Sequence, residues 1–265
     1  MMKNSVLFPN LQKLQRVQKK ILSLPKDIME WIRKARPKVE GKPRSFLACP
    51  FWEQIYHDES KNIIILGGRQ IFKSTYLTDI LAFMATTRPN STIVFVTHDN
   101  INRRGFANNK FRRGCIESNP LLKKMVRGYE RGTIGSIDEI IFKNGSTIYF
   151  VTDEGGFIQV EGKSPDVIVL DECQYQDLEF WYKLNEARAT TRGSIKFIGI
   201  GGEGGSQLED IWLSSDRKEW TSDDPNWRDK LRFDIHGDLI IGKYLTKVLK
   251  GKWVAKNPEA NPLVT

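Results

Sequence analysis

Residues 67–74 read GGRQIFKS and lie between an apolar run and a segment that we predict to be helical. They match the phosphate-loop pattern GxxxxGK(S/T) at Gly67, Lys73 and Ser74, but Phe72 replaces the second glycine of the pattern. In such a loop backbone N–H groups bind phosphate oxygens, the lysine reaches the terminal phosphates and the hydroxyl binds Mg²⁺. We therefore predict an ATP site, and the alternative is a strand-to-helix turn with an incidental lysine. The predicted loop contacts to ATP are Gly67, Gly68, Arg69, Gln70, Ile71, Phe72, Lys73, Ser74 and Thr75.

A second motif, VIVL at residues 167–170, ends in the adjacent acids Asp171 and Glu172. At the end of a buried strand the first acid can bind Mg²⁺ together with Ser74, and the second can orient or deprotonate a water molecule. The alternative is a strand that runs out into a polar loop. The two motifs lie about 100 residues apart, a separation over which a multi-stranded α/β sheet can bring them together. We therefore predict that Asp171 and Ser74 bind the metal and that Glu172 and Lys73 are catalytic.

The order of elements predicts a mostly parallel sheet flanked by helices, that is, an α/β fold. The predicted strands are apolar on both faces, as a sheet covered by helices requires, and they span residues 62–66, 92–97, 166–170 and 195–200. We predict helices at residues 74–85 and, strongly basic, at residues 103–113. An Asn-Gly turn at Asn144 and Gly145 predicts a hairpin between residues 139–142 and 147–151.

The net charge of +9 is concentrated in an N-terminal arm. Residues 1–44 contain 12 Lys or Arg and three Asp or Glu, whereas the other 221 residues contain 29 of each kind. Apolar spacing within residues 11–32, interrupted at Pro25, predicts two short helices there. This basic helical arm either meets a nucleic-acid backbone or an acidic partner, or it is a solvated amphipathic helix that packs on the core.

Composition excludes several classes of protein. Hydrophobic residues make up 40% of the chain and charged residues 28%, which is typical of a globular protein. No apolar run approaches the roughly 18 residues that cross a bilayer, and no signal peptide is evident. Three cysteines without a CxxC pair support neither a disulfide framework nor a zinc site. We therefore expect a protein without membrane contact inside a cell.

From about Cys49 to Trp253 the sequence resembles the large terminase subunits of tailed double-stranded DNA viruses. The resemblance rests on Arg69-Gln70 in the loop, on Gln54, and on two further segments. These are EGKSPD at residues 161–166, where the glycine matches but the arginine of the family does not, and GIGGEGGS at residues 199–206, which resembles the segment that couples hydrolysis to DNA movement. The Thr-Pro that usually ends the coupling segment is absent.

The resemblance implies a P-loop NTPase fold of the RecA/ASCE type and a motor that couples Mg-ATP hydrolysis to translocation of double-stranded DNA into a capsid. Gln54 is then the reader of adenine, and Arg69 is a catalytic residue beside the transferring phosphoryl group. The implied partners are double-stranded DNA, the portal protein, the small terminase subunit and further copies in a ring, although the isolated domain can be a monomer. The implied location is the procapsid in the host cytoplasm.

We expect residues 1–44 to form the arm and a linker, residues 45–213 the ATPase core, and residues 214–265 an extension toward a nuclease domain that this chain does not contain. A neighbouring subunit can supply a further catalytic arginine from the basic helix, where the available side chains are Arg103, Arg104, Arg112 and Arg113. Two other functions remain open: another nucleic-acid-dependent ATPase of the helicase or repair kind, and a degenerate DNA-binding protein that does not hydrolyse ATP.

Overall fold

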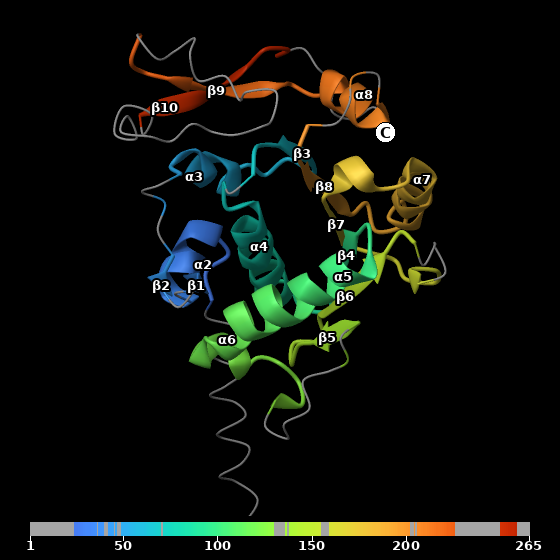
Figure 1. The fold of residues 1–265 in the computed structure, drawn as a ribbon. Helices are drawn as coiled ribbons and strands as arrows, with labels where there is room; N and C mark the ends of the chain where they lie inside the picture. The colour runs from blue at the N-terminus through green and yellow to red at the C-terminus, as the bar shows by residue number, and fades with distance from the viewer. Residues whose placement is uncertain are drawn as a thin grey trace, which may run out of the picture.

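A six-stranded sheet forms the centre of the protein (Figure 1). The structure is a computed structural model that describes residues 24–35, 37–39, 42–44, 46, 49–69, 71–129, 136, 138–154, 159–201, 204, 206–225 and 250–258. The strand order is β3-β8-β7-β4-β6-β5, in which only β5 is antiparallel to its neighbour. The strands are β3 (Asn62–Leu66), β4 (Thr92–Thr97), β5 (Glu139–Ile141), β6 (Thr147–Thr152), β7 (Val167–Asp171) and β8 (Ser194–Gly199).

The predicted parallel α/β sheet is therefore confirmed, with strand bounds within two residues of those expected from the sequence. The hairpin is also present: Gly145 at its turn has a φ of 90°, a conformation that glycine adopts without steric cost. Alternate residues of the central strands enter two different cores, one on each face. Ile93 and Phe95 lie in the first core, whereas Val94 and Val96 lie in the second.

Helices cover both faces of the sheet (Figure 1). Side chains of α2, α3, α4, η1 and α6 pack into the first core, and those of α7 and α8 into the second. The elements on the first face are α2 (Ile28–Ala35), α3 (Phe51–Tyr56), α4 (Lys73–Thr87), α5 (Asn100–Arg104), η1 (Gly105–Glu117) and α6 (Pro120–Lys123). Those on the second face are η4 (Cys173–Tyr175), α7 (Leu178–Ala187) and α8 (Gln207–Ser214). None of the helices among the described residues has the length and apolarity to cross a bilayer.

The basic segment that we predicted to be helical, residues 103–113, is helical and contains two kinds of helix. Only α5 is α-helical, and η1 is a π-helix, whose wider turns join residue i to residue i+5. Phe106, Phe111 and Ile116 are buried and recur every five residues, which suits the wider turn. The Phe106 ring stacks on Phe95 of β4 with centroids 4.1 Å apart, so this helix is fixed to the sheet by its apolar side.

Two small sheets lie beside the central one: β1 (Lys38–Val39) with β2 (Lys42–Pro43), and β9 (Lys218–Ser222) with β10 (Gly251–Ala255). Part of the N-terminal arm packs on the core, because Trp31 of α2 is buried and its indole N–H donates to Thr86 Oγ1 of α4 at 3.0 Å. The first predicted arm helix, within residues 1–23, lies outside the described residues.

Candidate nucleotide site

The phosphate loop connects β3 to α4 at the carboxyl end of the sheet. Gly67 begins it, and its N–H donates to the carbonyl of Gly199 at the end of β8 (3.1 Å). A Cβ at position 67 would lie 2.5 Å from Ile71 Cδ1, so a larger residue there would displace the end of the Ile71 side chain. The Trp52 indole N–H donates to the carbonyl of Ile71 at 2.5 Å and supports the loop from α3.

Phe72 explains why the motif usually has glycine at this position. Its φ of 67° and ψ of 25° are left-handed, a region that costs a residue with a Cβ roughly 1–2 kcal/mol. Phe72 therefore has the backbone conformation that a glycine would adopt at this position. Its side chain is 41% exposed and lines the same cavity as Lys73.

Lys73 begins α4 and is only 9% exposed. Its ammonium donates to the loop carbonyls of Gly67 (2.7 Å) and Gly68 (2.6 Å). Burial lowers the pKa of Lys73, while the nearby carboxylates of Glu172 and Asp171 act to raise it. The ammonium thus lies within the field of the acidic pair and is held by its own loop.

The acidic pair lies at the end of β7. Asp171 is the last residue of the strand, and burial, followed by the neighbouring Glu172, raises its pKa to about 7 against the opposing effect of Lys110. Glu172 has a left-handed backbone with a φ of 53°. Its Oε2 accepts a hydrogen bond from Gln174 Nε2 at 2.5 Å, so the carboxylate is held in a fixed direction.

One cavity of about 1010 Å³ brings the two motifs together. Most of the predicted site residues that the structure describes share it or adjoin it. The predicted residues that line it are Arg69, Phe72, Lys73, Ser74, Thr75 and Glu172. Asp171 lies buried directly before Glu172, Gly67 and Gly68 accept from Lys73, and Ile71 is a buried part of the loop. Gln70 lies outside the described residues.

Gln54 is not brought into this cavity. It lies on α3, where its Oε1 accepts from the backbone N–H of Trp253 in β10 at 3.2 Å. It lines a separate cavity of about 440 Å³ along the edge strand β3. Sequence reasoning could not foresee this contact, because the partner strand lies 199 residues further along the chain.

Lys110 is a site residue that the sequence did not reveal. It lies on η1, lines the cavity, and donates to the Ser74 hydroxyl at 2.7 Å. Its charge also acts on Asp171, so one cation interacts with both predicted metal ligands. The arginines of the same segment are placed differently: Arg103 forms an ion pair with Asp138, Arg112 donates to the Ser136 carbonyl at 2.7 Å, and Arg104 and Arg113 are exposed.

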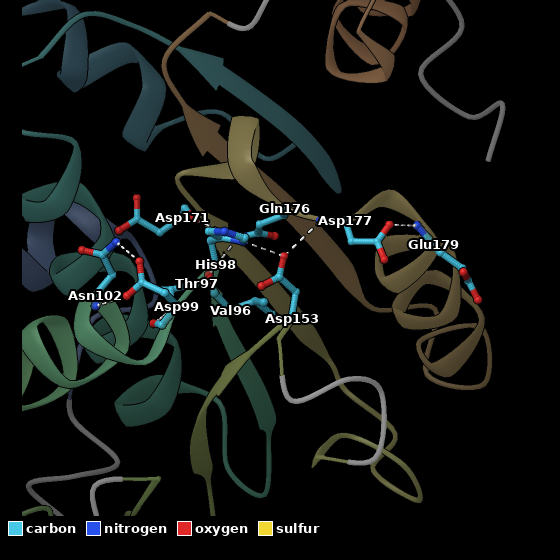
Figure 2. A network of polar contacts seen from close by, with 10 residues as sticks. All are labelled: Val96, Thr97, His98, Asp99, Asn102, Asp153, Asp171, Gln176, Asp177 and Glu179. Carbon is cyan, nitrogen blue, oxygen red and sulfur yellow. Dashed lines mark hydrogen bonds and ion pairs between the residues drawn. The ribbon is translucent and has the colours of Figure 1, made fainter.

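Two glutamines fix the segment that follows the acids. Gln174 Oε1 accepts from the Ile200 N–H at 3.0 Å, and a Cβ on Gly199 would collide with this amide. Gln176 Nε2 donates to the carbonyl of Asp171 at 2.7 Å, as Figure 2 shows. Gln174 thereby joins Glu172 to the start of the predicted coupling segment, of which Gly202, Glu203 and Gly205 lie outside the described residues.

A second polar network lies at the same edge of the sheet (Figure 2). Asp153, after β6, contacts His98 Nδ1 at 3.2 Å and accepts from the backbone N–H of Asp177 at 3.0 Å. Asp99 caps α5 through the N–H of Asn102 at 2.7 Å. These contacts tie together the loops after β4, β6 and β7, so the acidic pair lies in a rigid frame.

A phosphate loop after one strand and an acidic pair after another, at the carboxyl edge of a mostly parallel sheet, define a P-loop NTPase fold. The large terminase of bacteriophage HK97 is similar, with a TM-score of 0.57 and 17% sequence identity over 71% of this chain and 40% of that chain. The large terminase ATPase domain of Thermus phage P74-26 has a TM-score of 0.49 and 15% identity over 66% and 70% of the two chains. No protein-family model matches the sequence. No curated protein sequence matches it significantly.

The likeness to the HK97 protein shows that this chain shares the fold of the matched part of a phage large terminase, as the sequence resemblance implied. The chain spans 40% of the length of that terminase.

Proposed function

We propose that this chain is an ATP-hydrolysing motor domain of a large terminase that drives double-stranded DNA into a viral capsid. The observation that carries the proposal is the cavity in which Lys73 of the phosphate loop and Glu172 of the acidic pair face a common space. The terminase-like fold around this cavity supports it.

Lys73 has the role of phosphate binding. Its ammonium now donates to two loop carbonyls, and it exchanges these acceptors for the more negative phosphate oxygens when ATP binds. The loop N–H groups and the start of α4 provide further donors and a positive dipole end. Arg69 is exposed on the rim of the cavity, where its guanidinium can meet charge on the terminal phosphate.

The hydroxyl of Ser74 and the carboxylate of Asp171 fit Mg²⁺, which prefers oxygen ligands. That the Lys110 ammonium already interacts with both of them supports this fit. Bound Mg²⁺ neutralises charge on the phosphates of ATP. Lys110 has to release the Ser74 hydroxyl before that oxygen binds a metal, so the basic π-helix responds to occupancy of the site.

Glu172 is the proposed general base. Gln174 holds one oxygen of its carboxylate, which leaves the other free to accept a proton from a water molecule in the cavity. Double-stranded DNA, the portal protein, the small terminase subunit and a ring of identical subunits are the partners that we propose from the family resemblance, and the procapsid in the host cytoplasm is the proposed location. Helicase-like ATPases remain the alternative among enzymes.

A degenerate, non-hydrolysing DNA-binding protein is the second candidate function. Two observations favour it: Phe72 occupies the glycine position, and Lys73 is satisfied by its own loop. It predicts that the chain binds no ATP.

Calorimetric titration of Mg-ATP into the protein separates the two candidates. The motor predicts binding that Lys73→Ala weakens by about 10- to 100-fold, because a hydrogen bond to a charged group contributes about 1.5–3 kcal/mol. Lys124→Ala is the matched control, since Lys124 is exposed and lies outside the cavity. Absence of heat from the parent protein would reject the motor. Hydrolysis that rises with duplex DNA but not with single strands would favour packaging over a helicase.

A further inference from the structure

A second large cavity, of about 750 Å³, lies at the opposite end of the sheet from the phosphate loop. It is bordered by the residues that precede β3, β4, β7 and β8 and by the last turn of α4, whereas the nucleotide cavity is formed where strands end. Neither motif of the proposed motor contributes a residue to it.

Lys196 is the unusual residue of this cavity. It is the third residue of β8, its side chain lines the cavity, and it is only 4% exposed. Its ammonium makes no hydrogen bond or ion pair with any residue that the structure describes. Burial lowers the pKa of Lys196 to about 8, an effect that Asp58 opposes and Arg88 reinforces, so at neutral pH the ammonium still carries its charge. Buried charges are normally paired, because removing an ion from water is costly.

Four carboxylates line the cavity as well; Asp27, Asp58 and Asp166 have other contacts, whereas Glu59 is exposed. Asp58 accepts from the Ser60 N–H at 2.9 Å and pairs with Lys218 at 3.2 Å. Asp166 accepts from the Thr92 N–H at 2.8 Å. Asp27 caps α2 through the Glu30 N–H at 2.8 Å. The cavity thus has five Lys or Arg side chains against four carboxylates, which leaves a small excess of positive charge.

Four further cations line the cavity, and their side chains make no hydrogen bond or ion pair with the described part of the chain. They are Lys26, Lys61, Arg88 and Arg192, all of them exposed. Together with Lys196 they give the cavity five cations, four of them exposed and one buried. An anion that accepts from an ammonium and from planar guanidinium groups at the same time suits this arrangement, and phosphate does so with several oxygens.

We propose that this cavity is a binding site for a phosphate group, with the Lys196 ammonium at its floor and Arg88 and Arg192 at its rim. The phosphate is either that of a free ion or that of a DNA backbone. The site is independent of the proposed ATP site and does not rest on the motor function.

Titration of pyrophosphate and of inorganic phosphate, in EDTA, into Lys73→Ala protein tests the site without contribution from the phosphate loop. We expect one binding event, which Lys196→Met in the same background weakens at least tenfold. Methionine keeps the apolar stem and removes a buried charge, so this variant should fold. Lys252→Met is the matched control, because Lys252 is an exposed lysine on a strand, β10, away from the cavity. Absence of binding to the Lys73→Ala protein, or equal binding by the Lys196→Met variant, overturns the proposal.

Two further measurements complete the test. Pyrophosphate should raise the thermal midpoint of the Lys73→Ala protein. In the same background it should also raise the midpoint of Lys196→Arg but not that of Lys196→Met. An equal rise in all three proteins contradicts the site. A 12-base-pair duplex that displaces pyrophosphate identifies the DNA backbone as the source of the phosphate. A duplex that leaves pyrophosphate bound identifies a free ion.

Discussion

The phosphate loop and the acidic segment face the same cavity, and each contains one residue with a Cβ in the left-handed conformation. At Glu172, φ is 53°, and the side chain is held by Gln174 at 2.5 Å. At Phe72, φ is 67°, and the ring is exposed on the cavity rim. The same backbone cost of roughly 1–2 kcal/mol is therefore incurred twice, once to aim a carboxylate and once only to close a turn.

In the proposed site the acidic half, residues 171–176, already has its side chains in place, whereas the phosphate loop has to rearrange. We call the acidic half the ready half. Residues 171–176 are fixed by Gln174, by Gln176 and by the contacts of the neighbouring strands. In the loop, Lys73 donates to the carbonyls of Gly67 and Gly68, which it would have to leave to bind phosphate as proposed. Strained backbone often marks functional sites. In the proposed mechanism the strained backbone serves the chemistry only in the acidic half.

The largest expected effect concerns the half that is ready. Glu172→Gln should lower turnover about 10²- to 10⁴-fold, because a general base contributes that much, while the affinity for ATP stays close to that of the parent protein. Phosphate release at saturating Mg-ATP and a separate ATP titration measure the two quantities. Glu179→Gln on α7, an exposed carboxylate outside the cavity, is the control. Undiminished turnover in Glu172→Gln would show that Glu172 is not the general base, and the acidic half would then have no catalytic role to distinguish it from the loop.

A second prediction concerns the charge buried at the acidic end. The pKa of Asp171 is about 7 in the folded protein, raised mainly by burial, against about 3.9 in an unfolded chain. Between these pH values the folded state binds more protons, so the free energy of unfolding falls as pH rises through this window, by about 1.4 kcal/mol per pKa unit. Asp171→Asn cannot ionise and should show a flatter pH dependence and greater stability than the parent at pH 8.

Urea unfolding at several pH values, in EDTA and without nucleotide, measures this difference. Asp210→Asn, which changes an exposed carboxylate in the first turn of α8, is the control and should follow the parent. If the free energy of unfolding depends on pH in the same way for Asp171→Asn and the parent, ionisation of Asp171 does not destabilise the folded protein.

A third prediction tests what holds the acidic half rigid. Gln174→Ala removes both the donor to Glu172 and the acceptor for the Ile200 N–H. Since one hydrogen bond to a charged group contributes about 1.5–3 kcal/mol, turnover should fall about tenfold with little change in KM. Hydrogen exchange at the Ile200 amide should become faster in the same variant. Gln174→Asn keeps the amide on a shorter arm and should lie between parent and Ala. Slow exchange at Ile200 in Gln174→Ala would contradict the contact itself.

The sequence predicted the positions of the strands and of the two acids. Continuous apolar runs located the strands, and the acids at the end of one run identified Asp171 and Glu172. What could not be read were contacts between side chains far apart in the sequence. Lys110 reaches Ser74 across 36 residues only because η1 packs on the sheet as a π-helix. Gln54 faces β10 rather than the nucleotide cavity because α3 packs beside that strand.

The smallest expected effect concerns the conformation of Phe72. Glycine adopts a left-handed backbone freely, whereas any residue with a Cβ incurs roughly 1–2 kcal/mol. Phe72→Gly should therefore be more stable than Phe72→Ala by about 1 kcal/mol, although glycine normally weakens a helix relative to alanine by a similar amount. Both variants lose the same ring, so the difference in their free energies of unfolding isolates the backbone. Greater stability of Phe72→Ala would mean that residue 72 does not have a left-handed backbone. Phe72 and Glu172 would then no longer share this conformation.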